Sequence, residues 1–174
     1  MEHRGVEIKM FKVGDNIVYP NHGAGTIVAI EVKKILGEEK KYYIMKLPIG
    51  DMKVMIPVEK VDEIGIRSVI SEEEADEVLT LLHANKSKMS QNWNRRFRAN
   101  MEKIKTGDIY EVAEVVRNLT IRDHEKGLST GEKKMLNTSR QILISELVLS
   151  KGMKEEEVDE LITNVLIDNE DDKE

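Results

Sequence analysis

The single tryptophan of the chain, Trp93, lies in the run Asn92-Trp93-Asn94-Arg95-Arg96-Phe97-Arg98. From Lys86 to Lys105 there are seven lysines and arginines but only one acid, Glu102, although the whole chain has a formal net charge of −6. Overall charge balance does not explain a basic segment in an acidic protein. Such a segment suits a polyanion, and an aromatic ring beside it adds a flat apolar face. The pattern indicates nucleic acid as a ligand.

Trp93 also has a purely structural interpretation. Apolar residues recur here at helical spacing, which is typical of an amphipathic helix that turns one stripe to a core and its arginines to solvent: Trp93, Phe97, Met101 and Ile104. Against this, Asn92 is a good N-cap, so Trp93 would stand in the first turn and could project past the helix end. Spacing alone favours the core slightly, and both interpretations stay open here.

The predicted secondary structure changes near residue 70, from strands to helices. Residues 11–67 contain short β-branched and alternating runs separated by glycine and proline, which predict strands: 16–19, 26–32, 42–47, 52–56 and 64–69. Four or five short strands in so few residues indicate a small SH3-like or Tudor-like β-barrel. We expect this domain to cover residues 9–70, preceded by an unpatterned extension over residues 1–9.

From Ser71 onward the pattern is helical. Ser71, Asp108 and Ser129 each precede by three residues a glutamate that can complete a capping box, while Gly107, Gly127 and Gly152 fall where helices should end. Five helices are predicted, over 71–84, 92–106, 108–126, 129–151 and 154–168. The expected fold class is α+β by domains: the barrel, an all-α five-helix bundle over 71–168, and a frayed acidic tail over 169–174.

Composition bounds the function classes. The 174 residues are 40% hydrophobic and include no cysteine, which excludes disulfides and thiolate metal sites. No apolar run approaches the roughly 20 residues that span a bilayer. The four histidines are scattered, with no spacing that suits a metal site or an acid–base pair. We expect a soluble, cytoplasmic protein that is not an enzyme and holds no metal or cofactor.

Motifs in both halves of the chain resemble the CarD/CdnL family of bacterial transcription regulators. The N-terminal half has Phe11-Lys12-Val13-Gly14-Asp15 and then Val18 to Gly25. The C-terminal half has the Trp93 run, Lys105 to Asp108, Ala113 to Leu119, Arg122-Asp123 and Gly127 to Lys133, in the family's order. The resemblance covers roughly residues 10–168. The barrel is also similar to a domain of transcription-repair coupling factors, whereas the helical half is not.

The resemblance implies a mechanism. The barrel would dock on the protrusion (β1 lobe) of the RNA polymerase β subunit, through residues corresponding to Lys33 and Ile35 after the second strand and Met55 in the fourth. The family often has a basic residue in place of Met55, so apolar packing is expected there. Trp93 would wedge into the promoter minor groove at the upstream edge of the bubble. Arg95, Arg96 and Arg98 would contact phosphates, and Lys133 would be a further DNA contact. Such a monomer would stabilise the open complex without sequence specificity and reach the nucleoid through polymerase.

Two other classes of function compete. A stand-alone nucleic-acid- or ribosome-associated protein would need a basic barrel, yet residues 1–67 carry eleven lysines and arginines against ten acids. An enzyme would need a site, and no catalytic pattern is visible. Co-purification with RNA polymerase, compared with binding to naked DNA, separates the first two classes.

Overall fold

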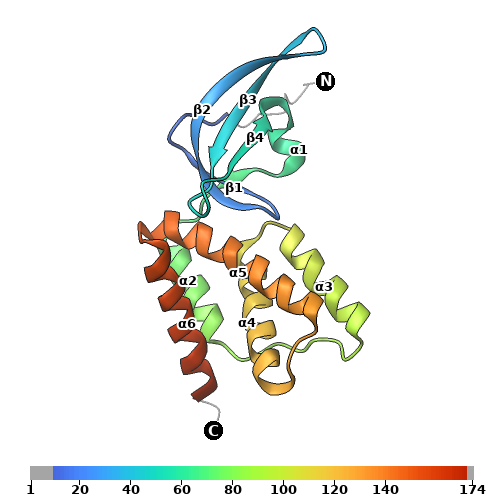
Figure 1. Cartoon of the computed structure of the whole chain (residues 1–174). Coiled ribbons are helices and arrows are strands. Elements are labelled where there is room, and N and C mark those ends of the chain that lie inside the picture. The colour runs from blue at the N-terminus through green and yellow to red at the C-terminus, as the bar shows by residue number, and fades with distance from the viewer. Residues whose placement is uncertain (1–9, 172–174) are drawn as a thin grey trace, which may run out of the picture.

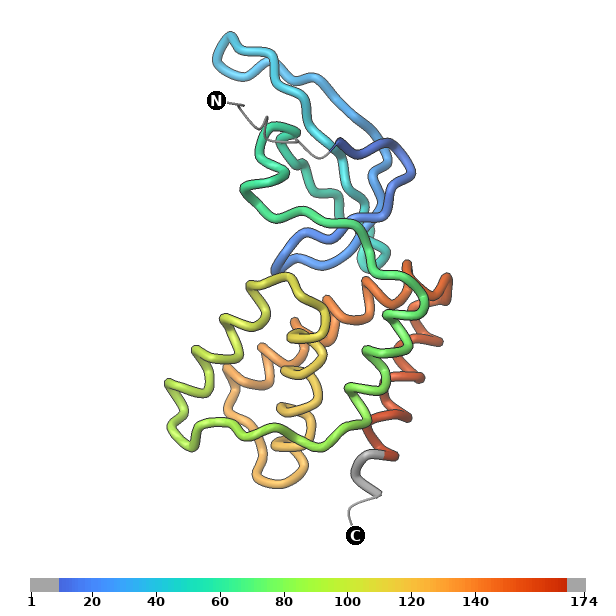
Figure 2. Tube along the Cα trace, turned by 180° about the vertical axis from the view of Figure 1, so that it is seen from behind, coloured from blue at the N-terminus to red at the C-terminus, as the bar shows by residue number. Residues whose placement is uncertain are grey.

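A computed structural model describes residues 10–171, with side chains to Asp168. The expected extension over residues 1–9 and the last three residues of the acidic tail lie outside the described residues. Figures 1 and 2 show a sheet standing on one end of a group of helices, so the two halves expected from the sequence occupy separate regions. The layout is therefore α+β, with the strands first along the chain.

Five antiparallel strands form the N-terminal sheet, in the order β4-β3-β2-β1-β5. They are β1 (Asn16–Tyr19), β2 (Gly23–Ile35), β3 (Glu38–Lys46), β4 (Lys53–Pro57) and β5 (Arg67–Ser68). One face covers a core that includes Ile17, Ile27, Met45 and Ile56, each fully buried. A 3₁₀ turn (Val58–Lys60) and the short helix α1 (Val61–Ile64) connect β4 to β5.

Three strand predictions need correction. The fifth strand does not begin at Ile64, which lies in α1; β5 contains only Arg67 and Ser68. The second and third strands are longer than expected, because Leu36 and Gly37 both adopt positive φ, 52° and 81°, and close a tight hairpin. Lys33 and Ile35 therefore lie within β2 rather than after it. The residues on both sides of this turn, 33–34 and 38–41, are charged and lack the apolar alternation that predicts a strand.

Five helices follow β5 in the described chain: α2 (Glu72–His83), α3 (Trp93–Lys105), α4 (Ile109–Lys126), α5 (Thr130–Lys151) and α6 (Glu155–Asp171). Ser71, Asn92, Asp108 and Ser129 are the N-caps of α2, α3, α4 and α5, as expected. Only Ser71 completes the expected capping box, with Glu74. Asp108 accepts from the amide of Tyr110, and the Glu132 carboxylate accepts from the Ser129 hydroxyl rather than from the Ser129 amide. The helix α6 continues to Asp171, past the expected end at 168.

The helices share one apolar core, to which α2, α4, α5 and α6 contribute most of the fully buried side chains. In both views α2 and α6 lie side by side at one edge, α3 lies at the opposite edge, and α5 runs beneath the sheet. This arrangement separates the acidic helices from the basic one.

Candidate nucleic-acid interface

Trp93 is the first residue of α3, and its indole stands at the edge of the helical core. The Asn92 side chain accepts from the amide of Arg95, so the predicted N-cap is confirmed. The Trp93 side chain is 42% exposed. Fully buried residues of this core reach 0% exposure, so the plain core interpretation is wrong. The helical spacing is nevertheless real, because Ile104 from the same stripe is buried.

Three contacts fix the orientation of the indole. It stacks on Phe97, with ring centroids 4.9 Å apart and planes 18° from parallel. Its Nε1 donates to Oγ of Ser129, the N-cap of α5, over 2.9 Å. A Cβ added to Gly131 would lie 3.6 Å from Cζ2 of Trp93, so the first turn of α5 also packs beside the ring. These contacts orient the part of the indole that remains exposed.

Arg96 does not face solvent, which corrects the expectation that it contacts phosphate. Its side chain is 4% exposed and donates from Nε and Nη2 to both oxygens of Glu132, over 2.9 and 3.1 Å. Hydrogen bonds from Arg96 hold the pKa of Glu132 below its ordinary value, against the opposing effect of burial. Glu132 also accepts from the Ser129 hydroxyl at 3.2 Å. Arg96 therefore positions Glu132, which in turn accepts a hydrogen bond from Ser129, the partner of the indole.

The polar stretch before α3 has no regular structure but is tied down. The Ser87 hydroxyl donates to Glu114 and its amide donates to Asn118, at 2.7 and 3.1 Å. Burial alone would raise the pKa of Glu114, but hydrogen bonds from Ser87 and Lys103 outweigh it and keep that pKa below its ordinary value. Further along, Arg96 Nη1 donates to the Ser90 carbonyl at 3.2 Å. These contacts fix the point at which α3 begins.

The remaining predicted DNA contacts are available. Arg95, Arg98 and Lys133 are exposed, and among the described residues none of the three has an ion-pair partner. By contrast, three cations of the basic segment are paired internally, which the count of charges in the sequence does not reveal: Lys86 with Glu125, Arg96 with Glu132 and Lys103 with Glu114.

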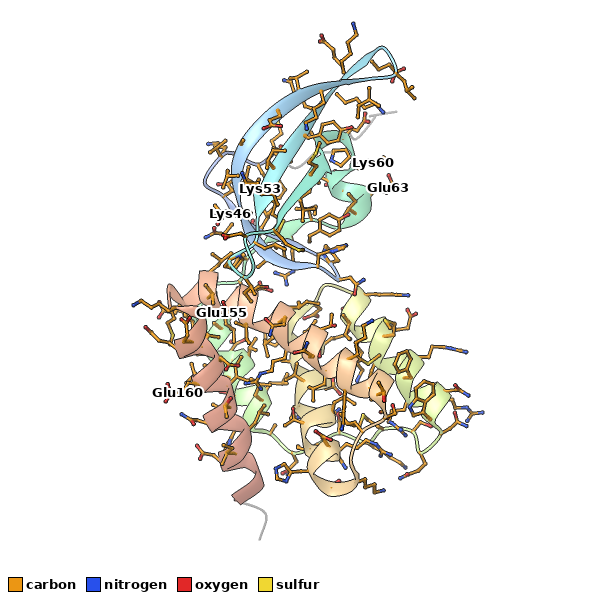
Figure 3. The ribbon with its side chains drawn as sticks, in the orientation of Figure 1. Lys46, Lys53, Lys60, Glu63, Glu155 and Glu160 are labelled. Atoms are coloured by element: carbon orange, nitrogen blue, oxygen red, sulfur yellow. The ribbon has the colours of Figure 1, made fainter. Side chains whose placement is uncertain are left out.

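The helical part has two electrostatically different sides. The first turns of α2 and α6 are acidic, with Glu72–Glu74 in one and Glu155–Glu157 in the other. Figure 3 shows Glu155 and Glu160 on α6, at the edge opposite α3. A polyanion is therefore repelled from the α2–α6 edge and attracted to the α3 edge. Net acidity and a local basic surface are compatible for this reason.

The sheet residues predicted to meet polymerase share one face but do not touch. Register pairs Lys33 with Lys40, and Ile44 with Met55; alternation then places Lys33, Ile35 and Met55 on the same side of the sheet. Lys33 lies at 3.8 Å from Glu31, in an exposed ion pair. Met55 lies in β4, as predicted, and is 42% exposed. Sequence reasoning missed the other exposed apolar residues of the hairpin: Val28, Ile30, Val32 and Leu36.

Within residues 10–171, no cluster of three or more histidine, aspartate or glutamate side chains is placed to hold a metal ion. In the same range no helix is both long and apolar enough to cross a bilayer.

Comparison with known proteins assigns both halves of the chain. Residues 11–70 match the CarD-like/TRCF RID domain, and residues 77–163 match the CarD C-terminal domain. A protein of Bacillus subtilis (strain 168), named "Putative transcription factor YdeB", is 44% identical over 149 residues, which cover 86% of this chain and 97% of the relative. The chain belongs to the CarD-like family. The resemblance seen in its motifs is confirmed, and the two matched domains correspond to the sheet and the helices.

Family membership and this relative support a role in transcription for the CarD-like protein. The sequence directed attention to Trp93 and its arginines, but it did not identify what holds them. Ser129 and Glu132 were recognised only as a helix cap. Their second function, supporting the indole and Arg96, depends on the approach of α5 to α3.

Proposed function

We propose that this CarD-like protein binds the RNA polymerase β subunit through its sheet and stabilises the promoter open complex through its helices. The observation that carries the proposal is the half-exposed indole of Trp93, oriented by Phe97 and Ser129 and flanked by Arg95 and Arg98, which have no ion-pair partner among the described residues. No catalytic residue is required, and the protein acts by binding alone, as a monomer in the cytoplasm.

An apolar side chain that enters between base steps must replace lost stacking, so it favours DNA whose stacking is already broken. The upstream edge of a melted bubble offers such a step. A ligand that prefers open over closed promoter shifts that equilibrium by its differential affinity, and a preference of about 1.4 kcal/mol is tenfold. Arg95, Arg98 and Lys133 would add affinity for phosphates that is independent of sequence and weakened by salt.

The sheet is suited to the protein partner. We propose that it is an SH3-like barrel, which its strand order and the 3₁₀ turn before β5 support. The strand β4 lies at its edge and presents Met55, and Ile35 of β2 is exposed on the same face, while Ile30 and Val32 expose apolar surface on the opposite face of β2. An edge strand can add to the sheet of another protein, and exposed apolar side chains then provide further contact area. Docking would hold the helices near promoter DNA and compensate for weak binding to free DNA.

Replacement of Trp93 tests the proposal. Trp93→Ala should shorten open-complex lifetime severalfold at one promoter while leaving polymerase binding unchanged, because the indole contacts Phe97 of α3 and Ser129 at the start of α5 rather than a strand. It should cost less stability than the about 3–5 kcal/mol typical of a buried aromatic residue, since the ring is half-exposed. The matched control is Ile167→Ala, which removes another half-exposed side chain from α6. Equal lifetimes for Trp93→Ala and wild type would disprove the wedge.

A further inference from the structure

The connection between the sheet and the helices is short, and each of its backbone amides is hydrogen-bonded. Only residues 69–71 separate β5 from α2. The amide of Val69 donates to Asn16, that of Ile70 to Glu146, and that of Ser71 to Glu74. A flexible linker leaves its amides to water, whereas each amide of this connection has a partner within the protein.

An ion pair closes the same joint. Arg67 of β5 donates from both terminal nitrogens to the two oxygens of Glu146 in α5, each over 2.7 Å. Arg67 also donates to the carbonyl of Gly107, in the turn between α3 and α4, over 2.8 Å. Glu146 is 1% exposed, although it is charged. One guanidinium therefore links the last strand to two separate parts of the helical half in a planar, directional arrangement.

Two strands away from β5, the start of β2 touches α5 as well. The Ala24 amide, at the start of β2, donates to the buried Ser145 hydroxyl over 2.9 Å. A Cβ on the neighbouring Gly23 would lie 2.7 Å from that hydroxyl, so only glycine allows the approach. Ile49, from the β3–β4 loop, packs on the helical core. Contacts from three different parts of the sheet half resist bending and rotation of the sheet relative to the helices.

The helix α5 extends this joint to the indole. Glu146 binds the sheet through Arg67, and Glu132, near the start of the same helix, binds α3 through Arg96. At 1.5 Å per residue the two glutamates are about 21 Å apart along the helix axis. A continuous helix thus connects the sheet to the element that carries Trp93.

We propose that the Arg67–Glu146 joint fixes the orientation of the sheet relative to the helices, so that polymerase docking alone sets where Trp93 meets DNA. Arg67 and Glu146 are positioning residues, and the protein is a rigid bridge rather than two tethered modules. This inference rests on the proposed function. A tether only raises local concentration, whereas a rigid connection of matching geometry also restricts the second contact to the productive orientation.

The test uses the full chain with Arg67→Met and Glu146→Leu combined, which removes both charges and leaves neither unpaired. The matched control is Arg140→Met with Asp159→Leu, an ion pair of 2.9 Å between α5 and α6 that does not reach the sheet. Rotational correlation times from NMR relaxation should be equal for sheet and helices in wild type and control. In the combined Arg67→Met and Glu146→Leu variant (the joint variant), the correlation times of the sheet and of the helices should become shorter and should differ from each other. Circular dichroism establishes that both halves of each variant remain folded. The milder Glu146→Gln repeats the test with a smaller change.

Open-complex lifetime gives the functional result. The joint variant should lose about 3- to 10-fold of the prolongation that wild type confers. Its affinities for polymerase and for naked DNA should match those of the control. A normal lifetime despite independent tumbling would overturn the positioning role, and so would equal tumbling of the two halves in the variant. If wild type itself fails to prolong the open complex, the proposed function fails, while the correlation times still decide whether the joint is rigid.

Discussion

Two arginine–glutamate pairs stabilise different boundaries of this protein. Arg96–Glu132 joins α3 to α5 within the helical half, and both side chains are less than 5% exposed. Arg67–Glu146 joins the sheet to α5, and its arginine is 27% exposed. Both pairs are bidentate. The first cannot be hydrated without opening the helical core, whereas water reaches the second from one side, so similar hydrogen bonds should contribute differently to stability.

The largest effect on stability should come from removing the partner of the buried Glu132 carboxylate. Arg96→Ala leaves Glu132 buried without its partner, and we expect a loss of about 3–5 kcal/mol in the free energy of unfolding, measured in urea. Arg67→Ala should cost less, about 1–3 kcal/mol, because water can replace part of the guanidinium. The combined Arg96→Met and Glu132→Leu variant should recover most of the first loss. Equal losses for the two alanine variants would contradict the difference in solvation.

A smaller effect separates the serines that support the two boundaries. Ser145→Ala leaves the buried amide of Ala24 without an acceptor and should cost about 1–3 kcal/mol. Ser129→Ala removes a helix cap and the partner of the indole and should cost about 1 kcal/mol. Urea unfolding measures both losses. Tryptophan fluorescence should change for Ser129→Ala alone, and a change for Ser145→Ala as well would show that the boundaries are not independent.

The smallest effect is the dependence of stability on pH. The pKa of Glu132 is lowered in the folded protein by the hydrogen bonds from Arg96. A depressed carboxyl pKa stabilises the folded state above the unfolded pKa, and this contribution disappears as pH falls through the folded pKa. Thermal melts should therefore show a loss that begins near the ordinary glutamate pKa of about 4.3 and grows at lower pH. Glu132→Gln should flatten this part of the profile, and an unchanged profile would refute the assignment.

The sequence alone determined the order and type of the main strands and helices, but not the 3₁₀ turn and the short helix α1 that precede β5. Capping residues and helical spacing are local properties of the chain, so the starts of α2, α3 and α5 followed from Ser71, Asn92 and Ser129. Strand boundaries were less accurate, because the Leu36-Gly37 turn lies among charged residues that resemble a loop. Family motifs identified Trp93 and its neighbours because a motif depends only on residue types and their order along the chain.

Only the tertiary structure decided which charges are available. Arg95 and Arg96 are adjacent in sequence and chemically equivalent, yet one is exposed and the other is buried on Glu132. Helical rotation separates neighbouring residues by about 100°, and the outcome for each depends on whether a distant element covers that side. The joint between Arg67 and Glu146 is equally invisible in sequence, since 79 positions separate its partners. Burial and pairing over such separations are properties of the folded molecule, because they require elements that meet only after the chain has folded.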